Sequence, residues 1–165
     1  MNDAHFHLTV NHLPIIIPGI ALLVILGGFI FKSEIVKRTA YFLFIIGALS
    51  TFVAFSSGEG AEEVVEHMGA DHHLIHEHEE MAETFALFSH ALGLLSLVGL
   101  WANWKRKKFS NIIAIIVIFV SAAALYCGRA TGTTGGEIMH TEIRNDNGGA
   151  PSSATEEKHE EHDDH

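Results

Sequence analysis

The sequence predicts an all-α fold: a four-helix transmembrane bundle of two antiparallel hairpins, with both the N- and C-termini extracytoplasmic. Three observations predict it: four long segments without a charged residue, basic residues gathered in two short turns, and acids and histidines gathered elsewhere. Of the 165 residues, 48% are hydrophobic, yet the net charge is -10 and there are 13 histidines. This separation of apolar and polar residues along one chain indicates that two solvents surround it.

The four uncharged segments are each 17 to 21 residues long. A helix needs roughly 20 apolar residues to cross about 30 Å of hydrocarbon, and a surface helix of a soluble protein would carry a polar face. The segments cover residues 13–31, 39–55, 84–104 and 109–127. With their flanking residues, they predict helices over about 13–31, 39–67, 76–104 and 109–130. Residues 1–144 then form one membrane domain.

The basic residues predict the orientation. Seven of the ten lie within residues 32–38 and 105–108, between the first and second and between the third and fourth helices. Loops rich in lysine and arginine stay in the cytoplasm, so both turns are expected to face inward and both termini outward. Trp101 and Trp104 lie beside the second turn, at the membrane interface that amphipathic rings prefer. Because both turns are short, the helices that they join are expected to be antiparallel.

Small residues inside the predicted helices offer surfaces for close helix contact. They are Gly27, Gly28, Gly47, Gly93, Gly99 and the alanine run 122–124. The ordinary composition of membrane helices would account for the same residues.

The C-terminal tail, residues 145–165, has a different composition. It is rich in acid and histidine and has no apolar residue beyond Ala154. Such a segment cannot bury enough surface to order itself, so the tail is predicted to be disordered. Its His159, His162 and His165 recur every third residue, and weak capture of a divalent metal is the alternative interpretation.

All histidines but one and all acids but one are expected outside the hydrocarbon and the cytoplasm, near the outer helix ends. Glu63 and His67 lie four residues apart, a spacing that puts both on one helix face. Glu137 and His140 have the Glu-x-x-His spacing, which lets two side chains of a helix reach one metal. The candidate metal ligands are His12, Glu63, His67, His78, Glu137 and His140. Imidazole with carboxylate suits Zn, Fe, Mn or Cu(II), whereas a solvated acidic face is the simpler interpretation.

The helix predicted over 76–104 carries histidines on two stripes. His76 and His90 share one stripe with several glutamates, whereas His78 shares another with Phe85, which predicts that His78 faces the core. A titratable residue inside the membrane is costly and usually functional. His90 could therefore ligate haem iron, relay a proton or hydrogen-bond a neighbouring helix.

Arg129 is expected at the outer end of the last helix, where a basic residue departs from the positive-inside pattern. It could pair with an outer glutamate or hold a haem propionate. The residues after it, 131–136, predict a flexible turn, and no strand or lysine supports a phosphate loop there. The candidate cofactor-binding residues are His12, His78, His90, Arg129 and His140.

Composition excludes several function classes. The single cysteine, Cys127, excludes an internal disulfide and any multi-cysteine zinc or iron–sulfur site within one chain. The acidic balance argues against nucleic acid as a partner. No nucleophile–base arrangement or metalloprotease motif is present, so no catalytic residue is predicted and a stand-alone enzyme is not expected.

Four motifs in order make the chain similar to an uncharacterised bacterial family of four-helix integral membrane proteins with a domain of unknown function. They are His-Leu-Pro-Ile at 12–15, Ser-Gly-Glu-Gly-Ala-Glu-Glu at 57–63, His-Glu-Glu at 78–80 and Thr-Gly-Gly-Glu-Ile-Met-His at 134–140. The likeness covers about residues 5–144. It implies a multi-pass protein of the bacterial cytoplasmic (inner) membrane and marks His12, His78 and His140. Many relatives carry a histidine at the position of Glu142. Relatives found beside respiratory redox proteins, including Rieske-type domains, imply electron transfer.

Three interpretations of function remain. The residue chemistry favours a transition-metal site (Zn, Fe or Cu) at the extracytoplasmic mouth of the bundle, for metal handling in the cell envelope. The alternative is haem b or another redox group for electron transfer, held by two histidines. The third is a ligand-free structural subunit of an envelope or respiratory complex. The lipid bilayer is the expected surrounding in each case.

Overall fold

The structure is a computed structural model that describes residues 2–144, and every element in that part of the chain is helical. The elements are α1 (Asp3–Val10), α2 (Leu13–Ile30), α3 (Glu34–Ser56), α4 (Gly58–His67), α5 (His72–Trp104), α6 (Ser110–Met139) and a short 3-10 turn η1 (Thr141–Ile143). The tail predicted over 145–165 lies outside the described residues.

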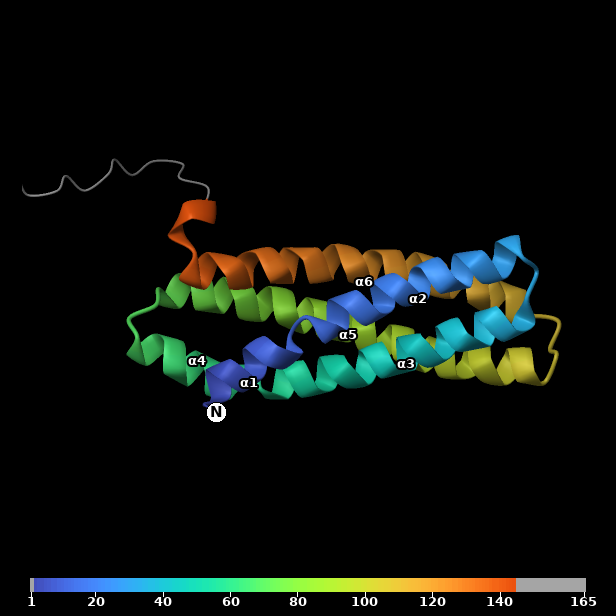
Figure 1. Ribbon diagram of the computed structural model, residues 1–165, viewed down its shortest axis with the longest axis horizontal. Helices are drawn as coiled ribbons and strands as arrows, with labels where there is room; N and C mark the ends of the chain where they lie inside the picture. Colours follow the sequence, from blue (N-terminus) through green and yellow to red (C-terminus); the bar gives the residue numbers. More distant parts are fainter. Residues whose placement is uncertain (1, 145–165) are drawn as a thin grey trace, which may run out of the picture.

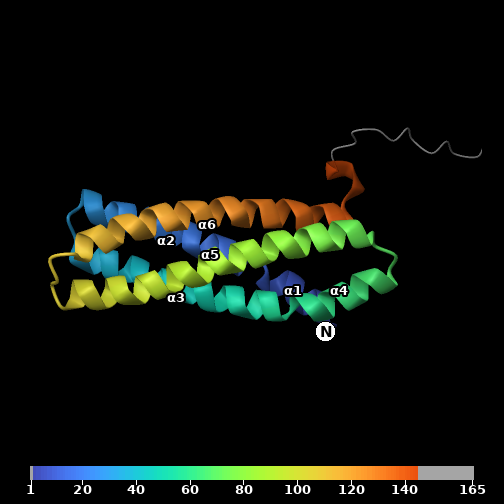
Figure 2. The ribbon, with the colours of Figure 1, turned by 180° about the vertical axis from the view of Figure 1, so that it is seen from behind.

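The long helices α2, α3, α5 and α6 lie side by side in one elongated bundle (Figure 1). α3 packs against α2 and α5, and α6 packs against α5 and α2. The connections 31–33 and 105–109 lie together at one end, which we call the turn end. Figure 2 shows α1, α4 and η1 toward the opposite end, which we call the histidine end.

Within residues 2–144, four helical stretches are long and apolar enough to cross a membrane: Asp3–Ile30, Glu34–His67, His72–Trp104 and Ser110–Met139. The prediction of an all-helical fold with four helices of membrane-spanning length and composition is confirmed for these residues. Leu23, Leu87 and Phe119 on the outside of the bundle are 71%, 70% and 72% exposed. An exposed apolar surface of this kind is typical of a face that contacts a membrane or another protein.

Glycines bring α5 close to α3 in the middle of the bundle. A Cβ atom on Gly93 would lie 2.5 Å from the Cβ of Ala48, and one on Gly99 would lie 2.5 Å from Cε1 of Tyr41. The Tyr41 side chain is fully buried by this approach. Gly93 and Gly99 therefore allow the close helix contact that the sequence predicts.

Capping residues start two helices earlier than predicted. The Ser33 hydroxyl accepts a hydrogen bond from the Val36 amide at 3.4 Å, so α3 begins at 34 rather than at 39. The Asp71 carboxylate accepts one from the His73 amide at 2.9 Å, so α5 begins at 72 rather than at 76. Side-chain oxygens at these positions satisfy amides that have no partner within the helix. The helix predicted over 39–67 is divided, with Ser57 between α3 and α4.

The largest difference from the prediction is in α6, which continues to Met139 instead of ending near 130. The flexible turn predicted over 131–136 is therefore wrong. Thr131 Oγ1 donates to the Cys127 carbonyl at 3.0 Å, and Thr134 Oγ1 donates to the Thr131 carbonyl at 3.1 Å. These hydroxyls bond back to the preceding turn, so the threonines remain inside the helix. The extra turns form one wall of the histidine end.

Candidate functional site

His78 lies at the histidine end, where α5 contacts the last turns of α6. Its Nδ1 is 3.1 Å from the carbonyl oxygen of Thr131 and 3.2 Å from Thr134 Oγ1. The His78 side chain is half-buried, and Phe85 and Ser89, further along the same stripe, are 6% and 1% exposed. The prediction that this stripe faces the core is confirmed.

The hydrogen bonds of His78 determine which ring nitrogen carries the proton. A carbonyl oxygen can only accept, so Nδ1 of His78 donates its proton to Thr131. The Thr134 hydroxyl donates to the same carbonyl, which leaves its lone pairs free to accept from Nδ1. Nε2 of His78 then carries the unprotonated lone pair, and it has no hydrogen-bond partner within residues 2–144.

Gly135 makes room for the His78 ring. A Cβ atom at this position would lie 2.8 Å from Cε1 of His78 and 3.1 Å from its Nδ1. One turn earlier, a Cβ on Gly132 would meet only Ile15, at an ordinary 3.8 Å. The imidazole therefore packs directly against the backbone of α6, which holds its plane and its position.

His7 of α1 is a second half-buried imidazole at this end. Its Nδ1 lies 2.9 Å from Ser57 Oγ, and that hydroxyl donates its own proton to the Ala54 carbonyl at 2.7 Å. With the Ser57 hydroxyl donating to Ala54, Nδ1 of His7 donates to Ser57, and Nε2 then carries the lone pair, as in His78. No role was predicted for His7, because no helix was expected before residue 13.

Both imidazoles lie outside the four apolar segments, and both are biased toward the neutral form. Burial lowers the pKa of His7, while the Ala54 carbonyl opposes that shift. Burial also lowers the pKa of His78, the hydrogen bond to Thr131 opposes it, and a positive charge on His7 lowers it further. Like charge on a nearby imidazole disfavours protonation, so the two rings oppose one another's charged form.

Carboxyl groups are also present on α4 and α5 at this end, among them Glu62 and Glu79. Burial and interaction with the Glu79 carboxyl raise the pKa of Glu62. Glu79 directly follows His78 in the chain. Within residues 2–144, however, no three His, Cys, Asp or Glu side chains converge closely enough to hold a metal ion as they stand.

Three predicted ligands lie apart from the imidazole pair. His12, Glu63 and His67 are exposed. His67 does share a helix with Glu63, but its Nδ1 lies 2.6 Å from the Glu63 carbonyl oxygen. The predicted spacing therefore produces a bond from a side chain to the backbone in place of a paired ligand set.

The Glu-x-x-His spacing of Glu137 and His140 does not produce a helical ligand pair, because α6 ends at Met139 and His140 is extended. His140 is exposed, and its Nδ1 lies 2.9 Å from a carboxylate oxygen of Glu142. The Glu137 carbonyl accepts from Arg144 Nε at 2.8 Å. The chain thus turns away after Met139, and the two side chains do not share a helix face.

His90 and Arg129 complete the predicted cofactor residues. His90 lies in the apolar part of α5, and its Nε2 is buried without a hydrogen-bond partner in the described part of the chain. The bond to a neighbouring helix that we considered for it is not formed at Nε2. Arg129 is exposed and forms no ion pair with a carboxylate among residues 2–144.

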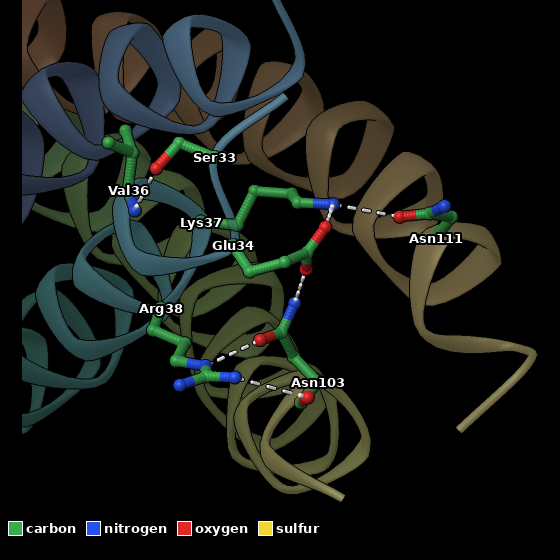
Figure 3. Close-up of polar contacts among 7 residues, drawn as sticks. All are labelled: Ser33, Glu34, Val36, Lys37, Arg38, Asn103 and Asn111. Atoms are coloured by element: carbon green, nitrogen blue, oxygen red, sulfur yellow. Dashed lines mark hydrogen bonds and ion pairs between the residues drawn. The ribbon is translucent and has the colours of Figure 1, made fainter. Parts of the chain in front are cut away.

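A second polar cluster, at the turn end, was missed by the sequence analysis (Figure 3). Lys37 is only 4% exposed, and its Nζ lies 2.6 Å from Glu34 Oε1 and 2.9 Å from Asn111 Oδ1. Asn103 donates to the other Glu34 oxygen and accepts from Arg38 Nε at 2.6 Å. The basic residues of the first turn therefore join α3 to α5 and α6. The sequence feature that could have revealed this cluster is a pair of asparagines, Asn103 and Asn111, at the ends of two apolar segments.

Comparison of the chain with protein-family models, with curated proteins and with solved structures found no match. The likeness to the four-helix family therefore rests on the four sequence motifs alone.

Proposed function

We propose that this protein binds a transition-metal ion, Zn, Fe or Cu(II), at the histidine end of a membrane bundle, with His7 and His78 as ligands. The ion is held for handling in the cell envelope, and no turnover is assigned to it. Compared with the set predicted from sequence, the proposal keeps His78 and replaces the exposed histidines by His7.

The observation that supports the proposal is the matched hydrogen bonding of the two rings. In each, Nδ1 donates to an oxygen, to Thr131 for His78 and to Ser57 for His7. Metal-bound histidines typically donate one ring N–H to such an oxygen, which fixes the ring and raises the basicity of the other nitrogen. Two neutral imidazoles with free Nε2 lone pairs are thus available at one end of the bundle.

Ligand chemistry favours a borderline metal ion over a soft or a hard one. Imidazole suits Zn, Cu(II) and Fe, whereas Cu(I) prefers thiolate or thioether and Mg or Ca prefers oxygen alone. The remaining positions would be filled by water or by carboxylates such as Glu62 and Glu79, whose interaction raises the pKa of Glu62.

The test is the metal content of the full chain, purified with an affinity tag that contains no histidine. We expect about one transition-metal ion per chain after exchange against Zn, Fe(II) and Cu(II), and an absorption spectrum without a Soret band. Substituting Asn for His159, His162 and His165 in the tail should leave that stoichiometry unchanged. Loss of the metal with the tail histidines, or a Soret band from bound haem, would overturn the assignment.

We also infer that the turn end faces the cytoplasm and that the two hairpins are antiparallel, which puts the metal site outside. Residues 32–38 and 105–108 carry seven of the ten basic residues, and such loops stay inside. Alkaline phosphatase, which is active only outside the cytoplasm, should be active when inserted after Gly69 and inactive after Arg106. The reverse pattern in a bacterial host would contradict this orientation.

A further inference from the structure

A shallow apolar groove lies on the outer surface of the bundle at the turn end. It has a volume of about 320 Å³ and is lined by Leu97, Leu100, Trp101, Trp104 and Lys105. Trp101 and Trp104 remain 51% and 69% exposed. The groove thus runs from apolar side chains of the membrane segment to a lysine just beyond its end.

Cations hold both indole rings of the groove. The Arg38 guanidinium lies 6.0 Å from the ring centroid of Trp104, and Asn103 fixes that guanidinium through Nε at 2.6 Å (Figure 3). Lys107 Nζ lies 5.5 Å from the ring centroid of Trp101. Stacking of this kind orients the rings, so the groove is a preformed feature on the lipid-facing side.

The positive charge around the groove is not neutralised by carboxylates of residues 2–144. Lys105, Arg106, Lys107 and Lys108 follow one another, and none forms an ion pair with a carboxylate within residues 2–144. Glu34, an acid at this end in the described part of the chain, is already bound to Lys37 and Asn103. An anion is therefore the complement that this surface lacks.

We propose that the groove binds an anionic phospholipid, with an acyl chain along Leu97 and Trp101 and the phosphate at Lys105 and Lys107. The ligand must be apolar over the membrane part of the groove and negative at its end, and a phospholipid of this kind meets both requirements. Basic residues beside a membrane helix, flanked by interfacial tryptophans, are the arrangement that recognises such headgroups. This proposal is independent of the metal site.

The chain contains its own reporter, because Trp101 and Trp104 are its only two tryptophans. Brominated lipids quench indole fluorescence on contact, so quenching measures lipid occupancy of this groove. We expect brominated phosphatidylglycerol at low mole fraction to quench roughly 25-fold more effectively than brominated phosphatidylcholine, because two lysines contribute. Each lysine near an anionic headgroup is expected to raise the affinity for that lipid roughly fivefold. Equal quenching by both lipids would overturn the proposal.

Two double variants that lose the same charge distinguish lipid binding at the groove from attraction by the net charge of the surface. Lys105→Gln with Lys107→Gln should reduce the preference for phosphatidylglycerol to about one. Lys32→Gln with Lys108→Gln removes as much charge outside the groove and should retain the preference. An equal loss in both variants would show that net charge alone attracts the lipid. If inorganic phosphate competes with the lipid, the groove binds a free anion. If quenching is suppressed only when the protein dimerises, a second copy covers the groove. Either result would overturn the proposal.

Discussion

Replacing His78 by alanine should weaken metal binding on the order of 100-fold, since removing even a partner that supports a ligand costs 10- to 100-fold. The variant loses the imidazole whose Nδ1 is fixed by Thr131 and Thr134 and whose Nε2 is free. Competition with a chromophoric chelator gives the affinity, and far-UV circular dichroism shows whether the helices persist. They should, because their apolar segments are unchanged.

The chain offers a matched control for each proposed ligand. His76, two residues earlier, has a side chain that is 72% exposed and pairs with Glu79 and Glu80, so His76→Ala should retain the affinity. His5 stands in the same relation to His7, since it is exposed on the same short helix. If His76→Ala lowers the affinity as much as His78→Ala does, the metal is bound by the solvated acidic face and the paired-imidazole site is wrong.

The membrane segments could be predicted because hydrocarbon imposes a length and a composition that are visible in one sequence. The orientation of His78 could also be predicted, because its stripe on the helix contains Phe85 and Ser89, which are buried. The first inference uses local length and composition, and the second uses helical periodicity. They need no knowledge of which helix lies opposite.

The partners of His78 could not be predicted, because they depend on two local departures from the sequence pattern. Thr131 and Gly135 were predicted to lie in a turn. Instead, the hydroxyl of Thr131 donates to a carbonyl within α6, and Gly135 has no Cβ atom that would exclude the imidazole. His7 was missed for a related reason. The short helix α1 carries no apolar periodicity, and only its contact with Ser57 shows the direction of the ring.

The positive-inside rule also gave an incomplete account of Lys37 and Arg38. Counted as charges, they predict an orientation, but charge counting does not reveal that Lys37 is 4% exposed. Its burial requires Glu34 from the same helix and Asn111 from α6. A buried charge without such partners would be costly, so these contacts are the reason that the residue can lie there.

Substituting alanine for Gly28 should destabilise the bundle by about 1 to 3 kcal/mol, the usual cost of forcing extra volume into a packed contact. A Cβ atom at this position would lie 2.6 Å from Cγ of Lys37, and 3.0 Å from its backbone nitrogen. The side chain could move, but the backbone of α3 cannot move without separating from α2. Any such shift also displaces Lys37 from Glu34 and Asn111, to which it is bound.

The neighbouring Gly27 supplies the control. Both residues are glycines of α2, and they differ only in the space around an added Cβ atom. A Cβ on Gly27 meets only the far edge of the Phe31 ring, at 4.0 Å. Gly27→Ala should therefore leave stability unchanged or raise it by up to about 1 kcal/mol, the difference in helix propensity. Reversible unfolding by sodium dodecyl sulfate in mixed micelles measures both variants. Since the two glycines have the same intrinsic cost, equal effects would show that α2 and α3 do not approach each other at Gly28.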